Sequence, residues 1–303
     1  MTSSNSLKCV VSDSWVVSML EINKIYQGDC LEVMKTFPDN SINMILTSPP
    51  YDNLRDYKGY TFDFEGIAKE LYRVVKDGGV VVWVVGDATI KFCESLSSFK
   101  QAISFNSIGF NLLDTMIYYK QNYAPAYPTL RRYANQFEYM FVFSKGKPKT
   151  FNPIQKEKVR IASGMSSFTK KDGSKIVKYV DRNTRPTKDA SNVWEYPSSS
   201  KNQNHPAVFP EKLAEDHILS WSNEGDTILD PMAGSGTTCK MAKLNNRNYI
   251  GIEISEEYVD ICNKRIMEVK SGCDANDDGI PPNNNKTVIS YNVESLKTDL
   301  ESL

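Results

Sequence analysis

An uninterrupted apolar run, Val80 to Val85, places the strongest constraint on the fold of this chain. Its residues do not alternate with polar ones, so they predict a strand that is buried on both faces, as strands of parallel sheets are. The preceding stretch, Phe64–Lys76, has apolar residues at helical spacing, and Asp77-Gly78-Gly79 predicts its end. A helix followed by a doubly buried strand indicates an α/β fold.

The same alternation continues along the chain and is lost only between Lys147 and Ser200. Further strands are predicted at Asn43–Leu46, Met116–Tyr119, Tyr139–Phe143, Thr227–Leu229 and Tyr249–Ile252. Further helices are predicted at Leu31–Thr36, Phe209–Trp221, Thr238–Asn245 and Glu256–Met267. We therefore predict a mostly parallel sheet flanked by helices, interrupted by a polar segment that is too long for an ordinary loop.

Composition and cysteine spacing restrict the function classes. The 303 residues are 40% hydrophobic and 24% charged, and no apolar run is long enough to span a bilayer. The first residues lack the pattern of a signal peptide, so we expect a cytosolic protein without membrane association. The six cysteines form no Cys-x-x-Cys pair and lie far from His205 and His217. Zinc-ligand spacing is therefore absent, and we expect no metal.

Charge is distributed unevenly along the chain. From Lys145 to Lys188 there are thirteen basic and three acidic residues, a net charge of about +10, whereas the whole chain carries −1. A basic segment on an otherwise acidic body is the pattern expected for phosphate binding. A solvated surface loop is the alternative that charge alone leaves open.

The stretch Thr47-Ser48-Pro49-Pro50-Tyr51 follows a predicted strand and joins an alcohol, two prolines and an aromatic ring. Proline fixes φ and has no backbone N–H, so the loop is rigid and its carbonyls are free to accept hydrogen bonds. Rigid acceptors beside an aromatic face suit a flat ring that carries an amino group. A nucleobase such as cytosine or adenine has this outline.

A second loop, Asp230 to Thr238, contains Gly234 and Gly236 between a predicted strand and a predicted helix. Glycines let a ligand approach the backbone, and a helix N-terminus favours a negative group. Glu253 ends the next strand about 20 residues later, where nucleotide-binding βαβ units hold a ribose. The loop lacks both the ATP-type phosphate motif and the full dinucleotide fingerprint, so S-adenosylmethionine fits best. A tight strand–helix turn is the structural alternative.

Together the two motifs resemble the amino-group DNA methyltransferases, and their order, with the Ser-Pro-Pro-Tyr loop first and the glycine loop last, is similar to that of the beta group. The resemblance covers roughly Ile22 to Val269 and implies a Rossmann-like, S-adenosylmethionine-dependent methyltransferase fold with a mostly parallel seven-stranded sheet. It implies an N-terminal extension (1–21), a catalytic part (22–146), a target-recognition insertion (147–200), a cofactor-binding part (201–270) and a flexible tail (271–303).

The resemblance also implies the site residues. Cofactor contacts are expected from Asp29, Cys30, Thr47, His205, Phe209, Asp230, Pro231, Ala233, Gly234, Ser235, Gly236, Thr237, Thr238 and Glu253. Contacts with DNA are expected from Lys156, Lys158, Arg160, Lys170, Lys171, Lys175, Arg182 and Arg185. Considered without their neighbours, Asp29 reads as a helix N-cap and His205 as a surface residue before a proline.

The catalytic residues implied are Ser48, Pro49, Pro50, Tyr51 and Asp87. The Ser48 hydroxyl and the Pro49 carbonyl accept hydrogen bonds from the target amino group and stabilise the charge that develops on nitrogen. Tyr51 stacks on the base after it leaves the duplex. Asp87 either orients Ser48, relays the released proton, or only caps a helix.

The most detailed expectation concerns which base is methylated. Ser-Pro-Pro-Tyr is typical of family members that make N4-methylcytosine, and Asp-Pro-Pro-Tyr of those that make N6-methyladenine. We therefore expect cytosine N4 in double-stranded DNA, in a prokaryotic restriction–modification or epigenetic system, with adenine N6 as the alternative. C5 methylation is not expected, because it needs a thiolate and no Pro-Cys dipeptide is present. An RNA or protein amide substrate, a non-catalytic DNA-binding relative, and a monomeric or homodimeric state stay open.

Overall fold

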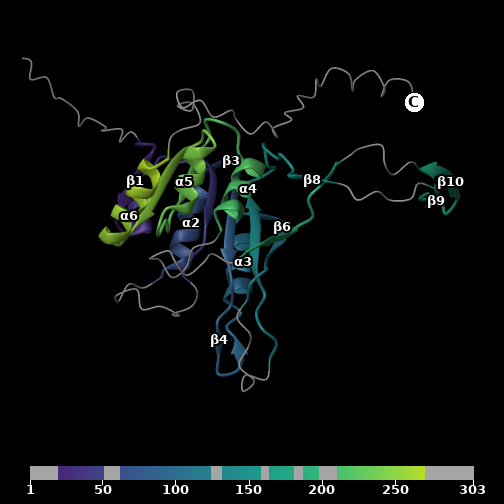
Figure 1. Ribbon diagram of the computed structural model, residues 1–303, viewed down its shortest axis with the longest axis horizontal. Coiled ribbons are helices and arrows are strands. Elements are labelled where there is room, and N and C mark those ends of the chain that lie inside the picture. Colours follow the sequence, from purple (N-terminus) through teal and green to yellow (C-terminus); the bar gives the residue numbers. More distant parts are fainter. Residues whose placement is uncertain are drawn as a thin grey trace, which may run out of the picture.

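The computed structural model describes residues 20–50, 62–123, 132–157, 164–180, 187–197 and 210–269. An eight-stranded sheet runs through this part of the chain in the order β1-β14-β13-β2-β3-β7-β6-β12 (Figure 1). In that order its strands are Lys24–Gln27, Asn248–Glu253, Thr227–Asp230, Ile42–Thr47, Val75–Val85, Phe137–Ser144, Asn111–Lys120 and Val193–Tyr196.

Strand direction confirms the predicted fold class. The first five strands in this order (β1, β14, β13, β2 and β3) are parallel to one another. Strand β7 is antiparallel to both of its neighbours, and β6 and β12 are parallel to each other. The sheet has one strand more than the seven expected. The additional edge strand, β12, comes from the segment expected to form the insertion, and its Trp194 and Tyr196 are buried.

Helices cover both faces of the sheet and give three layers. One face carries α1, α2 and α3 (Cys30–Met34, Phe64–Val74 and Ser97–Ile108), and the other carries α4 and α5 (Glu211–Trp221 and Thr237–Leu244). Helix α6 (Glu256–Met267) packs beside β1 through Cys262 and Ile266. No helix in the described ranges has the length and hydropathy needed to cross a bilayer.

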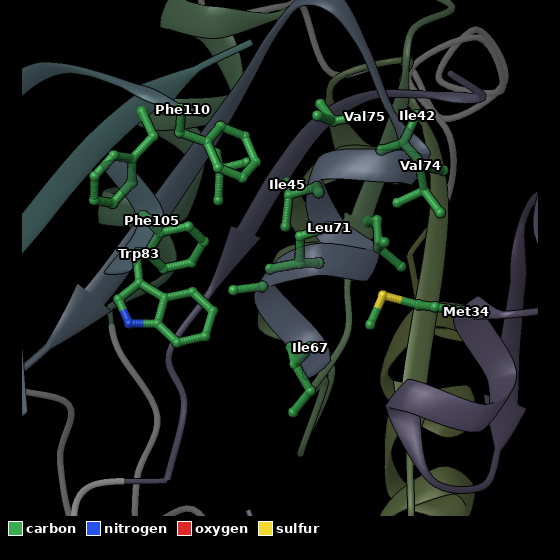
Figure 2. Packing of buried hydrophobic residues seen from close by; sticks show 14 of the residues in the cluster. Met34, Ile42, Ile45, Ile67, Leu71, Val74, Val75, Trp83, Phe105 and Phe110 are labelled. Carbon is green, nitrogen blue, oxygen red and sulfur yellow. The ribbon is translucent and has the colours of Figure 1, made fainter. Parts of the chain in front are cut away.

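Strand β3 is the centre of the core, as its apolar run predicts. Val81, Trp83 and Val85 belong to the cluster under α1–α3, and the alternate valines belong to the cluster under α4 and α5. Figure 2 shows Ile67, Leu71 and Val74 of α2 near Ile42, Ile45 and Val75, with Trp83, Phe105 and Phe110 alongside. Burial of this strand on both faces fixes its position in the sheet.

The beginning of β3 differs from the sequence prediction. Helix α2 ends at Val74 rather than at Lys76, and Asp77-Gly78-Gly79 lies inside β3 instead of before it. Val75 pairs with Ile42 but Val80 pairs with Met44, so the extra residues form a bulge, with φ +80° at Gly78. A Cβ atom at Gly79 would lie 2.8 Å from the Asn43 carbonyl oxygen, so this close approach requires glycine.

Short strands also form outside the main sheet. Thr89–Ile90 (β4) and Cys93–Glu94 (β5) make a hairpin just after β3. In the polar segment, Gln155–Glu157 (β8) pairs with Thr187–Asp189 (β11), and Gly164–Thr169 (β9) pairs with Lys175–Val180 (β10). The two pairs form an arm that extends from the sheet, with β9 and β10 at its far end (Figure 1).

Candidate active site

Five parallel strands end at the same edge of the sheet, and a predicted site residue stands at the end of each one. Asp29 follows β1, Glu253 ends β14, Asp230 ends β13, Ser48 follows β2 and Asp87 follows β3. Ligands of open α/β sheets bind in the crevice outside the carboxyl ends of the strands. The topology therefore brings these five residues to one edge, although they are far apart in the sequence.

The connections leave this edge in opposite directions. From β13 the chain passes through α5 to β14 on one side, and from β2 it passes through α2 to β3 on the other. Strands β13 and β2 are direct neighbours, with Ile228 paired to Met44 and Leu229 to Ile45. This is a topological switch point, the place at which open α/β sheets bind their ligands. The Ser48 loop and the Asp230 loop border it from the two sides.

The glycine loop is fixed by Glu253. The Gly234 N–H donates to Glu253 Oε2 at 2.8 Å, and the Ser255 N–H donates to Oε1 at 2.9 Å. Each carboxylate oxygen keeps lone-pair capacity for another donor, such as a ribose hydroxyl. Gly234 and Gly236 have positive φ values of 52° and 80°, and the loop leads directly into the N-terminus of α5.

Helix α6 approaches this loop closely at Gly236. A Cβ atom at Gly236 would overlap the Cys262 Sγ of α6, so the sequence needs glycine here for space as well as for φ. Arg265 of α6 donates from Nη1 to the Ser235 carbonyl oxygen at 2.7 Å and to the Ser235 Oγ at 2.6 Å. Glu253 and Arg265 thus hold two adjacent residues of the loop, Gly234 and Ser235.

Arg265 and Glu211 are site residues that sequence reasoning missed. The Arg265 Nη2 donates to Glu211 Oε1 at 2.8 Å, and the Lys240 Nζ lies 2.7 Å from the same oxygen. Partial burial tends to raise the pKa of Glu211, but Lys240 and Arg265 hold it below its usual value. The network ties the start of α4 to α5, α6 and the glycine loop. Its members lie on separate helices, so no local sequence pattern marks them.

Asp230 is buried beside the loop, with 3% of its surface exposed. Burial raises the pKa of its carboxyl group to about 6, although the Thr47 and Thr238 hydroxyls and the Met232 N–H partly offset the shift. Burial, together with the charge of Asp29, also raises the pKa of the Cys30 thiol to about 12. This edge of the sheet therefore carries carboxylates and neutral groups, which disfavours a pyrophosphate and suits a cationic ligand.

Asp29 has the role of a helix N-cap, the alternative given for it in the sequence analysis. Its Oδ1 accepts hydrogen bonds from the Leu31 N–H at 2.9 Å and the Glu32 N–H at 3.2 Å, so it is the N-cap of α1. The cap holds it at the end of β1, where the Gly28 N–H donates to the Glu253 carbonyl oxygen at 3.0 Å. A cap and a ligand contact are compatible, because the second carboxylate oxygen stays available.

Asp87 is also bound to a helix start. It accepts from the Ser98 N–H at 2.9 Å, from the Ser98 hydroxyl and from the Ser95 hydroxyl at 3.2 Å, at the first turn of α3. Asp87 thus binds the start of α3 from outside that helix, whose N-cap residue is Leu96. Ser48 is half-buried at the end of β2, Pro49 is buried and Pro50 is half-buried. Tyr51, His205 and Phe209 lie outside the described residues.

A cavity of about 290 Å³ opens beside Asp87, between the end of β3 and the start of β7. Phe137 and Tyr139 form an aromatic wall, in which Tyr139 stacks on Phe141 at 5.2 Å between ring centroids. Burial, with the charges of Asp87 and Glu94, raises the pKa of Tyr139. The residues that line the cavity are Gly86, Asp87, Glu94, Arg132, Tyr133, Ala134, Asn135, Phe137, Glu138 and Tyr139.

The basic segment divides between two places. Lys156 lies on β8, Lys170 and Lys171 lie in the β9–β10 turn, and Lys175 begins β10; all four are exposed. Lys145 instead follows β7 at the opposite edge of the sheet, where its Nζ donates to the Tyr72 and Val75 carbonyl oxygens at 3.0 and 3.1 Å. Lys158, Arg160, Arg182 and Arg185 lie outside the described residues.

Comparison with known proteins gives a consistent family. A family model described as DNA methylase, of the N6/N4 type, matches residues 42–264. The orphan methyltransferase M.BamHII of Bacillus amyloliquefaciens is 52% identical over 239 residues, which cover 75% of this chain and 89% of that protein.

Solved structures extend the similarity to the fold. TTHA0409 of Thermus thermophilus, in complex with S-adenosyl-L-methionine, matches with a TM-score of 0.55 and 26% identity over 81% of this chain and 93% of that one. The cytosine-N4-specific PvuII DNA methyltransferase has a TM-score of 0.59 over 91% and 90% of the two chains, and at 23% identity it shows the fold alone. The chain therefore belongs to the N6/N4-type DNA methylase family, whose members are S-adenosylmethionine-dependent methyltransferases.

Proposed function

We propose that this protein is a site-specific DNA methyltransferase that methylates the exocyclic N4 of a cytosine flipped out of duplex DNA. The observation that supports this most is the pairing of β2 with β13, which places the Ser48 loop and the Asp230 loop on the two sides of one crevice. One loop carries hydrogen-bond acceptors for an amino group, and the other has the form of a nucleoside-binding loop.

The cofactor is assigned to the glycine-loop side. Glu253 accepts hydrogen bonds from the ribose hydroxyls, and the first turn of α5 with Thr237 and Thr238 receives the methionine carboxylate. Asp29, Cys30, Thr47, Asp230 and the rest of the loop through Ser235 form the remaining wall, to which His205 and Phe209 contribute from outside the described residues. When bound, S-adenosylmethionine supplies an electrophilic methyl group on a sulfonium sulfur, a positive charge that suits the acidic lining.

The target amino group is assigned to the other loop. An exocyclic amine is a weak nucleophile because its lone pair is delocalised into the ring. The Ser48 hydroxyl and the Pro49 carbonyl accept hydrogen bonds from the two amino hydrogens, which localises the lone pair and stabilises the positive charge that develops. Pro50 keeps the loop rigid, and Tyr51 stacks on the base.

The flipped base is assigned to the cavity beside Asp87. Ser48 follows β2, the cavity opens where the adjacent β3 ends, and neighbouring strands lie about 5 Å apart. Phe137 and Tyr139 offer aromatic surface to the ring. Asp87, held in place by α3, orients Ser48 or takes up the proton released from the methylated nitrogen.

The molecule is proposed to act on duplex DNA, as a monomer or a homodimer, with residues 22–146 and 201–270 as the methyltransferase parts and 147–200 as the recognition insertion. The C-terminal part of that insertion forms β12, which belongs to the main sheet. The arm formed by β8 to β11 is therefore the portion available to contact DNA.

The choice between cytosine and adenine is tested by product analysis. Duplex DNA is incubated with the protein and isotope-labelled S-adenosylmethionine, digested to nucleosides and separated by mass spectrometry. We expect N4-methylcytosine as the labelled product, because Ser48 rather than an aspartate precedes Pro49-Pro50. N6-methyladenine as the sole product would replace the cytosine assignment, and label in neither base would remove the proposed function.

A further inference from the structure

Strands β9 and β10 form a two-stranded antiparallel ribbon at the end of the arm (Figure 1). Its large apolar side chains are exposed: Met165 by 66%, Phe168 by 55%, Val177 by 57% and Tyr179 by 67%. An isolated two-stranded hairpin is marginally stable at best in water, since it buries too little apolar surface. Exposed apolar groups on such a ribbon indicate a surface that a partner covers.

Charge identifies the kind of partner. Four lysines and one acid lie within residues 164–180, a net charge of +3. The acid, Asp172, is occupied inside the turn, where it accepts from the Ser174 N–H at 2.9 Å and the Ser174 hydroxyl at 2.7 Å. These bonds lower its pKa, so it stays ionised but turned toward its own backbone. Within residues 164–180, no other acid competes with a polyanion for the lysines.

The strand register separates the ribbon into two unlike faces. Tyr179 pairs with Met165, Val177 with Ser167 and Lys175 with Thr169, so these six side chains share one face, and all six are exposed. On the other face Ile176 pairs directly with Phe168, and Ile176 is half-buried. The first face, called the reading face below, is thus the more accessible one.

The reading face has the composition of a base-reading surface. It combines hydroxyls at Ser167 and Thr169, an ammonium group at Lys175 and apolar groups at Met165 and Val177. In the major groove, lysine recognises the guanine acceptors, hydroxyls bond to several bases, and apolar groups contact the thymine methyl. The minor groove offers a poorer code and is only about 6 Å wide, whereas the major groove, about 12 Å wide, admits a two-stranded ribbon.

Dimensions set the extent of the contact. The three residue pairs of the reading face follow one another at intervals of two residues, about 6.6 Å along the strands. They therefore span about 13 Å, or roughly four base pairs of DNA.

On these grounds, and resting on the proposed function, we propose that the β9–β10 ribbon enters the major groove of the DNA substrate and reads part of the recognised sequence with its reading face. Lys170 and Lys171 in the turn then lie near the backbone phosphates. The site is a specificity element that is distinct from the crevice at the edge of the sheet.

The test compares single exposed substitutions on the two faces. Full-length Lys175→Gln and Thr169→Ala alter the reading face, and Lys178→Gln removes the same charge from the opposite face of the same strand. Each protein selects sequences from a duplex library with a randomised core, and methylation of the selected duplexes is measured separately. We expect the reading-face variants to lose preference at one or more base pairs by about tenfold or more, whereas Lys178→Gln keeps the same sequence preference.

Two readouts keep the two proposals apart. If the reading-face variants select the same sequence as Lys178→Gln, the ribbon does not read bases and the inference is wrong, whatever the methylation result. If the unmutated protein selects a sequence and the variants relax it, but none of them methylates DNA, the inference stands and the proposed function fails. Selection of no sequence by the unmutated protein overturns the inference as well.

Discussion

The two carboxylates that border the glycine loop are held in different ways. Glu253 receives two backbone N–H groups, whereas Asp230 is buried and receives one, from Met232. Backbone donors stabilise an ionised carboxylate, and burial penalises it. The charge state of Asp230 therefore depends on pH near 6.

This difference predicts a pH-dependent stability. Because burial raises the folded-state pKa of Asp230 to about 6, the folded state holds an extra proton at lower pH. The associated stabilisation is complete below the unfolded-state pKa and is lost as the pH rises through about 6. Asp230→Asn should remove this pH dependence.

The measurement is urea unfolding of both proteins at about pH 5 and pH 8. Between the lower and the higher pH, the unmutated protein should lose about 1 kcal/mol more unfolding free energy than the asparagine variant. If the two proteins differ in unfolding free energy by the same amount at both pH values, the pKa of Asp230 is not raised by folding.

Single residues also show where sequence reasoning stops. Asp29 could be read as a helix cap because a cap is a local pattern, and it forms one. Asp87 instead accepts from the Ser98 N–H, eleven positions further along the chain, which no local pattern marks. Arg265 and Glu211 could not be found, since their hydrogen bonds join residues 54 positions apart on different helices. Long-range polar networks leave no periodic signal in a sequence.

At the scale of an element, the glycine loop depends on the close approach of α6. Gly236→Ala should destabilise the protein in two ways, through its positive φ and through overlap with Cys262. Gly225→Ala is a matched control, because Gly225 has φ +81° but no atom lies within 4 Å of its Cβ position.

Chemical unfolding separates the two contributions. We expect Gly225→Ala to cost about 1 kcal/mol through strain and Gly236→Ala to cost about 1–3 kcal/mol more through overpacking. Equal losses for the two variants would mean that α6 does not constrain the loop.

The elements themselves were largely predictable where one face is buried. Helix α6 has the predicted bounds, Glu256–Met267, and β2, β13 and β14 differ from prediction only at their ends. The predicted start of β3 was wrong, because Gly78 and Gly79 were interpreted as the end of a helix, whereas they form a bulge inside the sheet. The strands of the arm were missed, since both of their faces mix polar and apolar residues and no alternation marks them.

At the scale of the molecule, function depends on strand order. Residues near Ser48 and residues near Asp230 are separated by most of the chain, and they meet because β13 pairs with β2. Periodicity predicts strands but not their order, so this juxtaposition came from the family resemblance rather than from the pattern of apolar residues. The observed sheet order agrees with it.

The most direct test of the account asks whether the two sides of the crevice have separate tasks. Single-turnover methyl transfer and calorimetric binding of S-adenosylmethionine are measured for Ser48→Ala and Glu253→Ala, with Ser41→Ala at the other end of β2 as the control. We predict that Ser48→Ala lowers the methyl-transfer rate by about 100-fold with little change in cofactor Kd. Glu253→Ala should raise that Kd by about tenfold or more and recover rate at high cofactor concentration. Loss of rate and of cofactor affinity to the same degree in both variants would contradict the assignment of the two loops.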